Sequence, residues 1–477
     1  MASVSPQTRA NIAATFGVSE REAGHIITQL LSGTQGLRSG GAHGNGFTWV
    51  LDTNVLRDAA LVLAADEVSS SLSSPPGACL SSDDGAASTN PRKPVLTSAC
   101  PGWICYAEKT HAYILPYLSR LKSPQALAGT LVKSVLAQAY NVSPEQIWHL
   151  AVMPCFDKKL EASRSELMSS SWDGGRWGTG IRDVDCVITA RELLLLASAR
   201  GIDIRSLPRK PVAQPAFPDE TLNAFLFPHH RRGVGDSTGG TSGGYLWHIM
   251  QTFSVRNPGS RIEVSRGRNA DVIEYSLVQN QQVLLQAARF YGFRNIQNLV
   301  RRLKPAKLSK MPGAGARRVG ARKPGATNGA STKSDKEYAY VEVMACPGGC
   351  TNGGGQVKAV DLGTVGGVLD SNVDVDQGLQ AQKEWLGRVD EAYFSASSDE
   401  DSDLDSMDID TPADPDVVNG ISTGYIQGIL KHWAALTGVE KEKLVYTSYR
   451  KVESDIGKKM NDVERVAGLA SSIGGGW

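Results

Sequence analysis

Apolar and polar residues follow one another along the chain in a pattern that predicts strands succeeded by helices. Residues 47–54, FTWVLDTN, form an apolar run that ends in an Asp/Asn turn, and a helical periodicity follows at 57–68. The pattern recurs as an apolar run at 149–155, HLAVMPC, and as a strand-like stretch at 184–189 followed by a helical stretch at 190–201. Alternation of this kind is typical of an α/β protein with a largely parallel sheet.

Residues that favour helix ends mark several element boundaries. Ser19 is placed to cap a helix, Glu22 to complete a capping box, and Gly33 to end that helix. Further along, the pattern predicts a strand at 271–277 and a helix over 283–303. The α/β pattern therefore continues to residue 303.

Length, charge and cysteine content narrow the class of protein. The 477 residues suffice for two or three domains with a large buried core. The net charge of +1 gives no case for a nucleic-acid partner or a membrane surface, and no run of 18 apolar residues occurs. Seven cysteines are an odd number, so a disulfide framework is not expected. We expect a soluble, intracellular protein whose cysteines serve a metal, catalysis or simple burial.

Three segments depart from the average composition. Residues 68–94 are rich in Ser, Gly and Pro and predict an exposed loop. Residues 301–323 carry many Lys and Arg without one acid, and 399–416 carry many acids without one base. Runs of like charge with few apolar residues rarely pack, so both are expected to be disordered insertions. They serve either as plain linkers or as docking segments for each other or for a partner.

Four cysteines stand where strand-like segments end, beside small residues. Proline follows Cys100 and Cys346 and precedes Cys155, and Cys350 closes the motif CPGGC. Proline stops the strand and fixes the turn, so each sulfur points away from the sheet. The carboxyl ends of parallel strands are where α/β folds bind ligands, so we expect these four side chains to converge on one site.

The residues near these cysteines suit a charged inorganic group. Gly348 and Gly349 are expected to let the backbone approach that group and turn amides toward it. Lys158 or Lys159 would offset the negative charge of four thiolates, and Glu161 lies close in sequence as a further polar neighbour or an ordinary ion-paired residue of a helix.

The identity of the bound group is open at this point. An iron-sulfur cluster tolerates ligands scattered over half the chain better than zinc does, because zinc sites usually draw on two closely spaced pairs. Buried, reduced cysteines without a metal are the third possibility. Of the remaining cysteines, Cys105 and Cys186 are expected to be packed in the interior, and Cys79 to be an incidental thiol. Asp52 is interpreted as a turn-capping residue rather than an acid-base catalyst.

Three motifs resemble the signature loops of iron-only hydrogenases. They are TSACPGW at 97–103, MPCFDKKLEASR at 153–164 and EVMACPGGCTNGGGQ at 342–356, with DTN at 52–54 upstream and DVDCVIT at 183–189 between. They resemble more closely the eukaryotic hydrogenase-like cytosolic iron-sulfur assembly factors, the family that includes the nuclear prelamin A recognition factor-like proteins. The resemblance covers about 47–365 and, weakly, 420–477.

The resemblance implies a two-lobe α/β fold with parallel sheets and a [4Fe-4S] cluster between the lobes. Its ligands would be Cys100, Cys155, Cys346 and Cys350. In hydrogenases the residue matching Cys350 also bridges to a binuclear iron centre, a lysine matching Lys158 touches that centre's ligands, and a cysteine before the first ligand relays protons. Ala99 stands in that relay position here, and alanine cannot carry a proton, so hydrogenase activity is not expected.

The amino end departs from the family pattern. Family members usually bind a second [4Fe-4S] cluster through four cysteines near the amino terminus, whereas no cysteine precedes Cys79 here. We interpret the chain as truncated, with loss of the second cluster as the alternative. The expected division follows from these observations: a helical remnant at 1–46, the hydrogenase-like lobes at 47–300 with the loop 68–94, a basic linker at 301–336, a strand and cysteine loop at 337–394, an acidic insertion at 395–418, and a helical segment with a tryptophan tail at 419–477.

The resemblance also implies a function without catalysis. The protein would bind [4Fe-4S] and help to pass preassembled clusters from scaffold NTPases to apoprotein clients through a targeting complex that contains a WD-repeat protein. Trp477, after three glycines, is expected to dock on that complex, with burial against the protein itself as the alternative. The expected location is the cytoplasm, with the nucleus as a second site. The competing hypotheses are a hydrogenase or derived electron-transfer protein and a cluster-free interaction protein.

Overall fold

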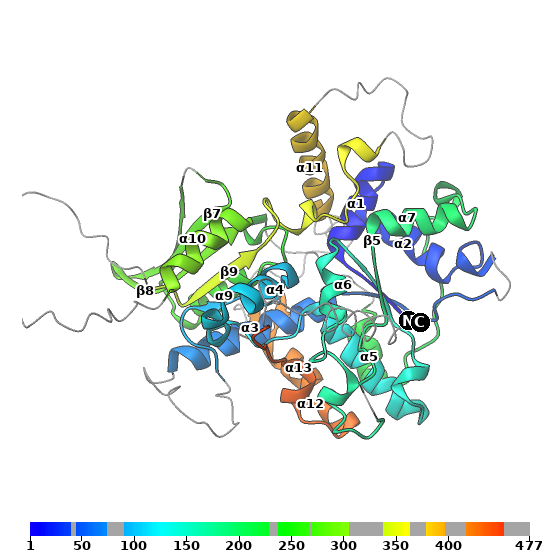
Figure 1. Ribbon diagram of the computed structural model, residues 1–477, viewed down its shortest axis with the longest axis horizontal. Coiled ribbons are helices and arrows are strands. Elements are labelled where there is room, and N and C mark those ends of the chain that lie inside the picture. The colour runs from blue at the N-terminus through cyan, green and yellow to red at the C-terminus, as the bar shows by residue number, and fades with distance from the viewer. Residues whose placement is uncertain are drawn as a thin grey trace, which may run out of the picture.

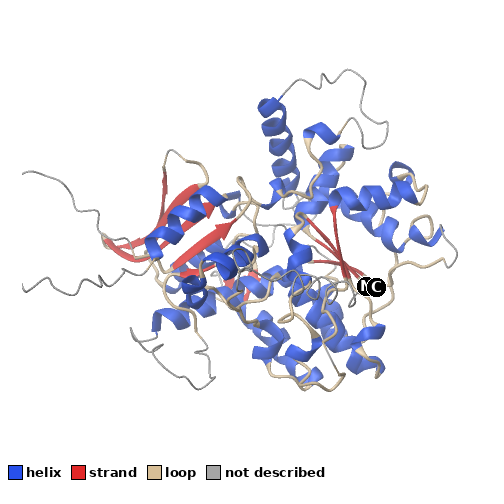
Figure 2. Ribbon diagram, viewed as in Figure 1, coloured by secondary structure: helices blue, strands red, loops and turns tan. Residues whose placement is uncertain are grey.

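The computed structural model describes residues 1–39, 44–73, 90–178, 180–228, 237–267, 269–304, 337–362, 378–395 and 416–452. Its strands form two larger sheets and a short hairpin, and helices surround both sheets (Figures 1 and 2). No helix within these residues is long and apolar enough to cross a membrane.

Strands and α-helices are distributed over the whole of the described chain. The strands are β1 (Ala2–Val4), β2 (Val50–Asp52), β3 (Val95–Leu96), β4 (Leu150–Met153), β5 (Cys186–Thr189), β6 (Arg261–Arg266), β7 (Val272–Gln279), β8 (Gln282–Tyr291), β9 (Tyr340–Met344), β10 (Val417–Val418) and β11 (Ile421–Ser422). The α-helices are α1 (Pro6–Phe16), α2 (Glu20–Ser32), α3 (Asn54–Ser73), α4 (Pro101–Thr110), α5 (Pro124–Tyr140), α6 (Asp157–Ala162), α7 (Ala190–Ala199), α8 (Glu220–Leu226), α9 (Tyr245–Arg256), α10 (Phe293–Leu303), α11 (Gly378–Ser395), α12 (Thr423–Thr437) and α13 (Lys441–Val445).

The first sheet is wholly parallel and has the strand order β2-β1-β4-β5. Each of its strands runs into a helix, and the alternation in the sequence predicts this for β2 and β5. Asp52 accepts a hydrogen bond from the Asn54 amide at 2.9 Å and so caps the turn after β2, and its other oxygen pairs with Arg9 at 2.6 Å. This confirms the structural interpretation of Asp52.

The second sheet has the order β3-β9-β8-β7-β6 and is mixed. The strands β3, β9 and β8 are parallel, whereas β8, β7 and β6 form an antiparallel meander. Figure 2 shows the strands of the two sheets as separate groups on either side of the molecule. The carboxyl ends of β3 and β9 in the second sheet and of β4 in the first sheet carry the cysteine loops.

Helices cover both faces of both sheets and join them into one body. One apolar core packs α3, α5, α9 and α12 against residues of both sheets, among them Leu51, Ala287 and Tyr340. A second core holds α1, α2, α7 and α11 on the first sheet, and a third holds α4 and α10 on the second. Because one core touches both sheets, the loops at their ends keep a fixed separation.

Two expectations from the sequence differ from the structure. Residues 283–303 were expected to form one helix, but Gln282–Tyr291 is the strand β8 and only Phe293–Leu303 is helical. The turn before β8 places Asn280 and Gln281 at positive φ of 50° and 64°, as a tight hairpin requires, and pairing with β7 and β9 outweighs the helical preference of LLQAAR. Residues 1–46 were expected to form a helical segment. The helices α1 and α2 do lie there, but Ala2–Val4 is also an interior strand of the first sheet, paired on both sides.

Several other expectations fall outside the described residues. They concern most of the loop 68–94, the basic linker after residue 304, and the acidic insertion between 396 and 415. Trp477 and Cys79 also lie outside the described parts of the chain. The capping box of Ser19 and Glu22, by contrast, is present at the start of α2.

Candidate metal centre

Four cysteines lie at the facing ends of the two sheets. Cys155 comes two residues after β4, Cys346 two residues after β9, and Cys100 occupies the position just before α4, which follows β3. Cys350 begins a short 3-10 turn, Cys350–Asn352, after the glycines. The helices α4 and α6, which follow the first two loops along the chain, contact each other in the middle of the molecule (Figure 1).

The four thiols are mutual neighbours. Burial, then Cys350 and Cys100, raises the pKa of Cys155 to about 12, although Lys158 opposes the shift. Burial, then Cys100 and Cys155, raises the pKa of Cys346 to about 12. Burial, then Cys346 and Cys100, does the same for the pKa of Cys350. Every pairing among the four side chains therefore contributes to at least one shift, so all four sulfurs share one small region.

The arrangement of the sulfurs distinguishes between metal groups. In a mononuclear thiolate site each sulfur lies about 2.3 Å from the same ion. No three His, Cys, Asp or Glu side chains in the described parts of the chain are arranged to hold a single ion in this way. A [4Fe-4S] cluster instead places a different iron in front of each sulfur, so its sulfurs stand farther apart. The described residues therefore offer no site for a single zinc ion at these four cysteines.

Lys158 and Glu161 form a buried polar pair beside the cysteines. The Lys158 ammonium donates to Glu161 Oε2 at 2.9 Å and to the Ala99 carbonyl oxygen at 3.1 Å. Glu161 Oε2 also accepts hydrogen bonds from Ser123 Oγ at 2.9 Å and from Gln125 Nε2 at 3.1 Å. Because Glu161 is only 6% exposed, it fixes the lysine in place rather than lying on a solvated helix face.

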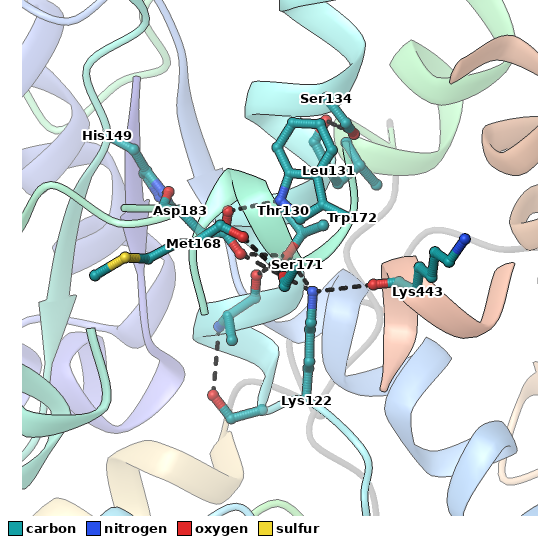
Figure 3. A network of polar contacts seen from close by, with 12 residues as sticks. Lys122, Thr130, Leu131, Ser134, His149, Met168, Ser171, Trp172, Asp183 and Lys443 are labelled. Carbon is teal, nitrogen blue, oxygen red and sulfur yellow. Dashed lines mark hydrogen bonds and ion pairs between the residues drawn. The ribbon is translucent and has the colours of Figure 1, made fainter. Parts of the chain in front are cut away.

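The segment that carries Ser123 is itself anchored by a buried network, shown in Figure 3. Lys122 Nζ donates to Thr130 Oγ1 at 3.0 Å and to the Lys443 carbonyl oxygen at 3.4 Å. Thr130 Oγ1 donates to Asp183 Oδ2 at 2.9 Å, and Trp172 Nε1 donates to Asp183 Oδ1 at 2.8 Å. Burial lowers the pKa of Lys122 to about 8, while the charge of Asp183 opposes this shift. The network ties α5 to α13 and holds Ser123 against Glu161.

The glycines of the cysteine loop have a different role from the one expected. The Gly348 amide donates to Asp271 Oδ1 at 2.8 Å, and the Gly349 amide donates to the Cys346 carbonyl oxygen at 3.3 Å, so neither is turned toward a bound group. Gly349 has φ +104°, and a Cβ there would collide with Thr241 Oγ1. Gly349 therefore allows this loop to pack directly on the chain around Thr241.

Residues 241–244, TSGG, were not anticipated as part of the site. Thr241 Oγ1 donates to the Gly348 carbonyl oxygen at 3.2 Å, and Ser242 Oγ accepts from the Cys350 amide at 3.2 Å. The segment is more than 100 residues from the cysteines it contacts, so only its density of glycines and hydroxyls marked it in the sequence.

The remaining candidates lie around the centre or apart from it. Lys159 pairs with Glu192 at 2.6 Å and lies over the Phe156 ring, so Lys158 is the one of these two lysines that lies beside the cysteines. Lys358, which the sequence did not single out, also lies near Cys346, where its charge opposes the rise in the pKa of the thiol that burial causes. Cys105 lies on α4 and Cys186 begins β5. Both are partly buried, and neither thiol is among the groups that shift the pKa values of the four neighbouring cysteines.

Comparison with known proteins places this fold in a class. The family described as "Iron only hydrogenase large subunit, C-terminal domain" matches residues 1–354. A variant of apo [FeFe]-hydrogenase HydA1 from Chlamydomonas reinhardtii has a TM-score of 0.59 over 95% of this chain and 94% of that chain, at 20% identity. The [FeFe]-hydrogenase HydA(deltaEFG) has a TM-score of 0.58 at 21% identity, with the same coverage. At this identity the likeness shows a shared fold, that of the iron-only hydrogenases.

Curated relatives narrow the assignment within that class. The cytosolic Fe-S cluster assembly factor NAR1 of Phaeosphaeria nodorum is 62% identical over 100% of this chain and 78% of its own length. The factors of the same name from Talaromyces marneffei and Penicillium rubens are each 54% identical over 100% of this chain and 80% of their lengths. The chain belongs to the NAR1 family of cytosolic Fe-S cluster assembly factors.

Proposed function

We propose that this protein is a component of cytosolic iron-sulfur cluster assembly and that it binds a [4Fe-4S] cluster through Cys100, Cys155, Cys346 and Cys350. The observation that carries the proposal is the convergence of the four thiols from two sheets into one buried region. The names of relatives more than 50% identical over the whole chain support the same role.

The surrounding residues suit a bound anionic cluster. When bound, the cluster would supply an electron-accepting or transferable inorganic core. Lys158 places a positive charge next to the thiolates, and Glu161 with Ser123 keeps that charge from moving away. The Ala345 amide donates to Cys100 Sγ at 3.3 Å, which stabilises the thiolate form of that ligand. Binding of the metal would release the protons that burial holds on the free thiols.

We further propose that the protein lacks hydrogenase activity. Ala99 offers a methyl group where the hydrogenase pattern has a proton-relaying cysteine, and its carbonyl oxygen is engaged by Lys158 at 3.1 Å. An anaerobic assay of hydrogen uptake and evolution on the cluster-loaded protein tests this. Activity that depends on Cys350 would favour the hydrogenase alternative.

In the cell, this role would place the protein in the cytoplasm between scaffold NTPases and a targeting complex with a WD-repeat subunit, from which apoprotein clients receive clusters. Capture of those components by the 477-residue chain, compared with a chain that lacks Trp477, tests the partner assignment. Equal capture by both chains would remove the docking role proposed for Trp477.

The cluster itself is tested by substitution of its ligands. Cys346→Ala or Cys350→Ala should abolish bound iron after anaerobic reconstitution, because an iron of the cube would lose its thiolate in a buried site. Iron and sulfide per chain are the readout, and Cys105→Ala is the matched control, since Cys105 lies on α4 outside the set of four. Full iron and sulfide in both ligand variants would refute the assignment.

A further inference from the structure

The loop that begins with Cys346 at the end of β9 finishes on the first sheet. Its residues 353–357 make hydrogen bonds to the chain after β4, to the start of α7 and to α1. The helices α1 and α7 contact each other on that sheet (Figure 1). The loop therefore joins the two sheets close to Cys350. This contact lies between two ligands of the proposed function, on which the following inference rests.

Two glycines of this segment lie directly against the residue before Cys155. The Gly355 amide donates to the Pro154 carbonyl oxygen at 3.0 Å. A Cβ on Gly353 would collide with the same oxygen and would lie 2.9 Å from the Pro154 carbonyl carbon. Because the atoms in the way belong to the backbone, a side chain at Gly353 would push the two loops apart.

Gly355 is enclosed from a second side, whereas its neighbour Gly354 is open. A Cβ on Gly355 would collide with Cγ2 of Thr189 and lie 2.6 Å from Cβ of that residue. The Arg191 amide, at the start of α7, donates to the Gly355 carbonyl oxygen at 3.2 Å. Gly354 is exposed, and a Cβ there would make an ordinary contact of 3.7 Å with the Phe156 ring. None of the three glycines has a positive φ, so their contacts alone decide the effect of an added methyl group.

The next two residues are fastened to α1. Asn11 is fully buried, and its Nδ2 donates to the Val357 carbonyl oxygen at 3.1 Å while its Oδ1 accepts from the Val357 amide at 2.8 Å. Gln356 Nε2 donates to the Gln7 carbonyl oxygen at 2.8 Å. Because α1 follows β1 directly, these bonds hold the segment on the first sheet. The segment has little room to move away from Pro154.

The contact between Gly353 and Pro154 connects two of the cysteine loops. Pro154 directly precedes Cys155, and the Gly353 amide donates to the Cys350 carbonyl oxygen at 3.0 Å. Cys155 follows a strand of the first sheet, whereas the loop of Cys350 starts from the second. A [4Fe-4S] cluster is a rigid cube that presents a different iron to each thiolate, so it binds only where the sulfurs stand at matching positions.

We propose that Gly353 and Gly355 are positioning residues that set the separation of the Cys155 and Cys350 sulfurs for the [4Fe-4S] cluster. Their missing side chains let backbone meet backbone at Pro154, so this separation does not depend on a rotamer. Neither glycine supplies a ligand, and neither makes or breaks a bond to iron.

The experiment adds one methyl group at each of three consecutive glycines in turn. After anaerobic reconstitution, Gly353→Ala and Gly355→Ala should lose iron to a chelator about tenfold faster than wild type, because the strain of overpacking falls on the ligand loops. Gly354→Ala should lose iron at the wild-type rate. Electron paramagnetic resonance of the reduced protein should show altered g values in the first two variants only. Urea unfolding of the unloaded proteins separates this effect from a general loss of stability.

A compensating substitution decides the outcome where Gly353→Ala or Gly355→Ala folds poorly. Thr189→Ser removes the Cγ2 methyl group and keeps the hydroxyl oxygen that accepts from the Glu192 amide at 3.4 Å, so Gly355→Ala combined with Thr189→Ser should retain more iron than Gly355→Ala alone. Equal iron loss and equal g values in Gly353→Ala and Gly354→Ala, or no recovery in the double variant, would overturn the inference while the proposed function stands. A wild-type protein without a [4Fe-4S] signal would overturn both.

Discussion

At the level of single residues, burial keeps some ionisable side chains neutral, and Glu67 is one of them. Glu67 on α3 is 6% exposed, and its Oε1 accepts the Arg120 amide at 3.0 Å. Its Oε2 has no hydrogen-bond partner among the described residues. Burial raises the pKa of Glu67 from 4.5 to about 7, despite hydrogen bonds from Ser119 and Arg120 that lower it. The carboxyl is therefore best accommodated in its protonated form.

Glu67→Gln should stabilise the protein on the alkaline side. The folded pKa of Glu67 lies above the unfolded value, so its contribution to stability is complete below pH 4.5 and is lost as pH rises through about 7. The full loss is about 3 kcal/mol, and the glutamine variant should avoid most of it. Urea unfolding at pH 5 and pH 8 measures the effect. The exposed Glu145→Gln is the control, and a gain at pH 8 no larger than at pH 5 would contradict the prediction.

At the level of elements, the cysteine centre depends on the contact between α4 and α6, because each of these helices follows a cysteine loop. Arg164, just after α6, donates to both oxygens of Glu108 on α4, at 2.8 and 2.7 Å. The Arg450 amide donates to the same carboxylate at 3.1 Å. The Arg164 and Glu108 side chains are only 12% and 6% exposed, so this two-pronged pair is little screened by water.

Arg164→Met should weaken the contact between α4 and the end of α6. The methionine keeps the apolar stem but leaves the Glu108 carboxylate buried with fewer partners, at a loss of about 3 kcal/mol in the free energy of unfolding. Urea denaturation measures this loss, and reconstituted iron per chain should fall with it. Lys443→Ala, which breaks an exposed pair with Glu440, is the matched control and should lose less than about 1 kcal/mol. Equal losses of unfolding free energy in the two variants would show that the pair of Arg164 and Glu108 adds nothing to the contact between α4 and α6.

The helices and strands also show which elements could be predicted from the sequence. Local signals predicted the capping box of Ser19 and the strand that ends before Cys155, because each depends on neighbours within a few residues. The strand β8 was missed because its pairing with β7 and β9 is decided by distant residues, whereas LLQAAR locally favours a helix. Ala2–Val4 is too short to show a period, and its two partner strands begin 48 and 148 residues later.

The distinction between local signals and contacts made by distant residues also applies to the candidate metal centre. The four cysteines were predicted because their residue type and the prolines beside them carry chemical meaning without any contact information. Ser242 was missed because a serine among glycines has no such meaning until the fold places it against Cys350. The amides of Gly348 and Gly349 were given the wrong direction because their partners, Asp271 and the Cys346 carbonyl, depend on the path of the folded loop.

At the level of the whole molecule, one apolar core touches both sheets and sets the distance between their cysteine loops. The helix α9 is part of this core, packing against α3 and against the second sheet, and its Leu246 amide donates to Glu342 Oε2 at 2.9 Å. His248 on α9 is 2% exposed within it. Burial, and then the positive charge of Arg57, lowers the pKa of His248 from 6.5 to about 4. The apolar core between the two sheets therefore contains an imidazole, that of His248, which burial keeps neutral.

The free energy of unfolding of this core should fall in mild acid. The unfolded chain protonates His248 near pH 6.5 and the folded chain only near pH 4, so the stability that its neutral form contributes is complete above pH 6.5 and is lost as pH falls toward 4. Relative to wild type, His248→Gln should gain stability over that interval, approaching about 3 kcal/mol. Other groups titrate in both proteins, so the quantity to compare is the difference in urea-derived free energy of unfolding at pH 7.5 and at pH 4.5, with the pH 7.5 difference as the internal reference. A difference that stays constant between the two pH values would mean that His248 is protonated equally in the folded and unfolded states, and that the core between the sheets is more accessible to water than its burial implies.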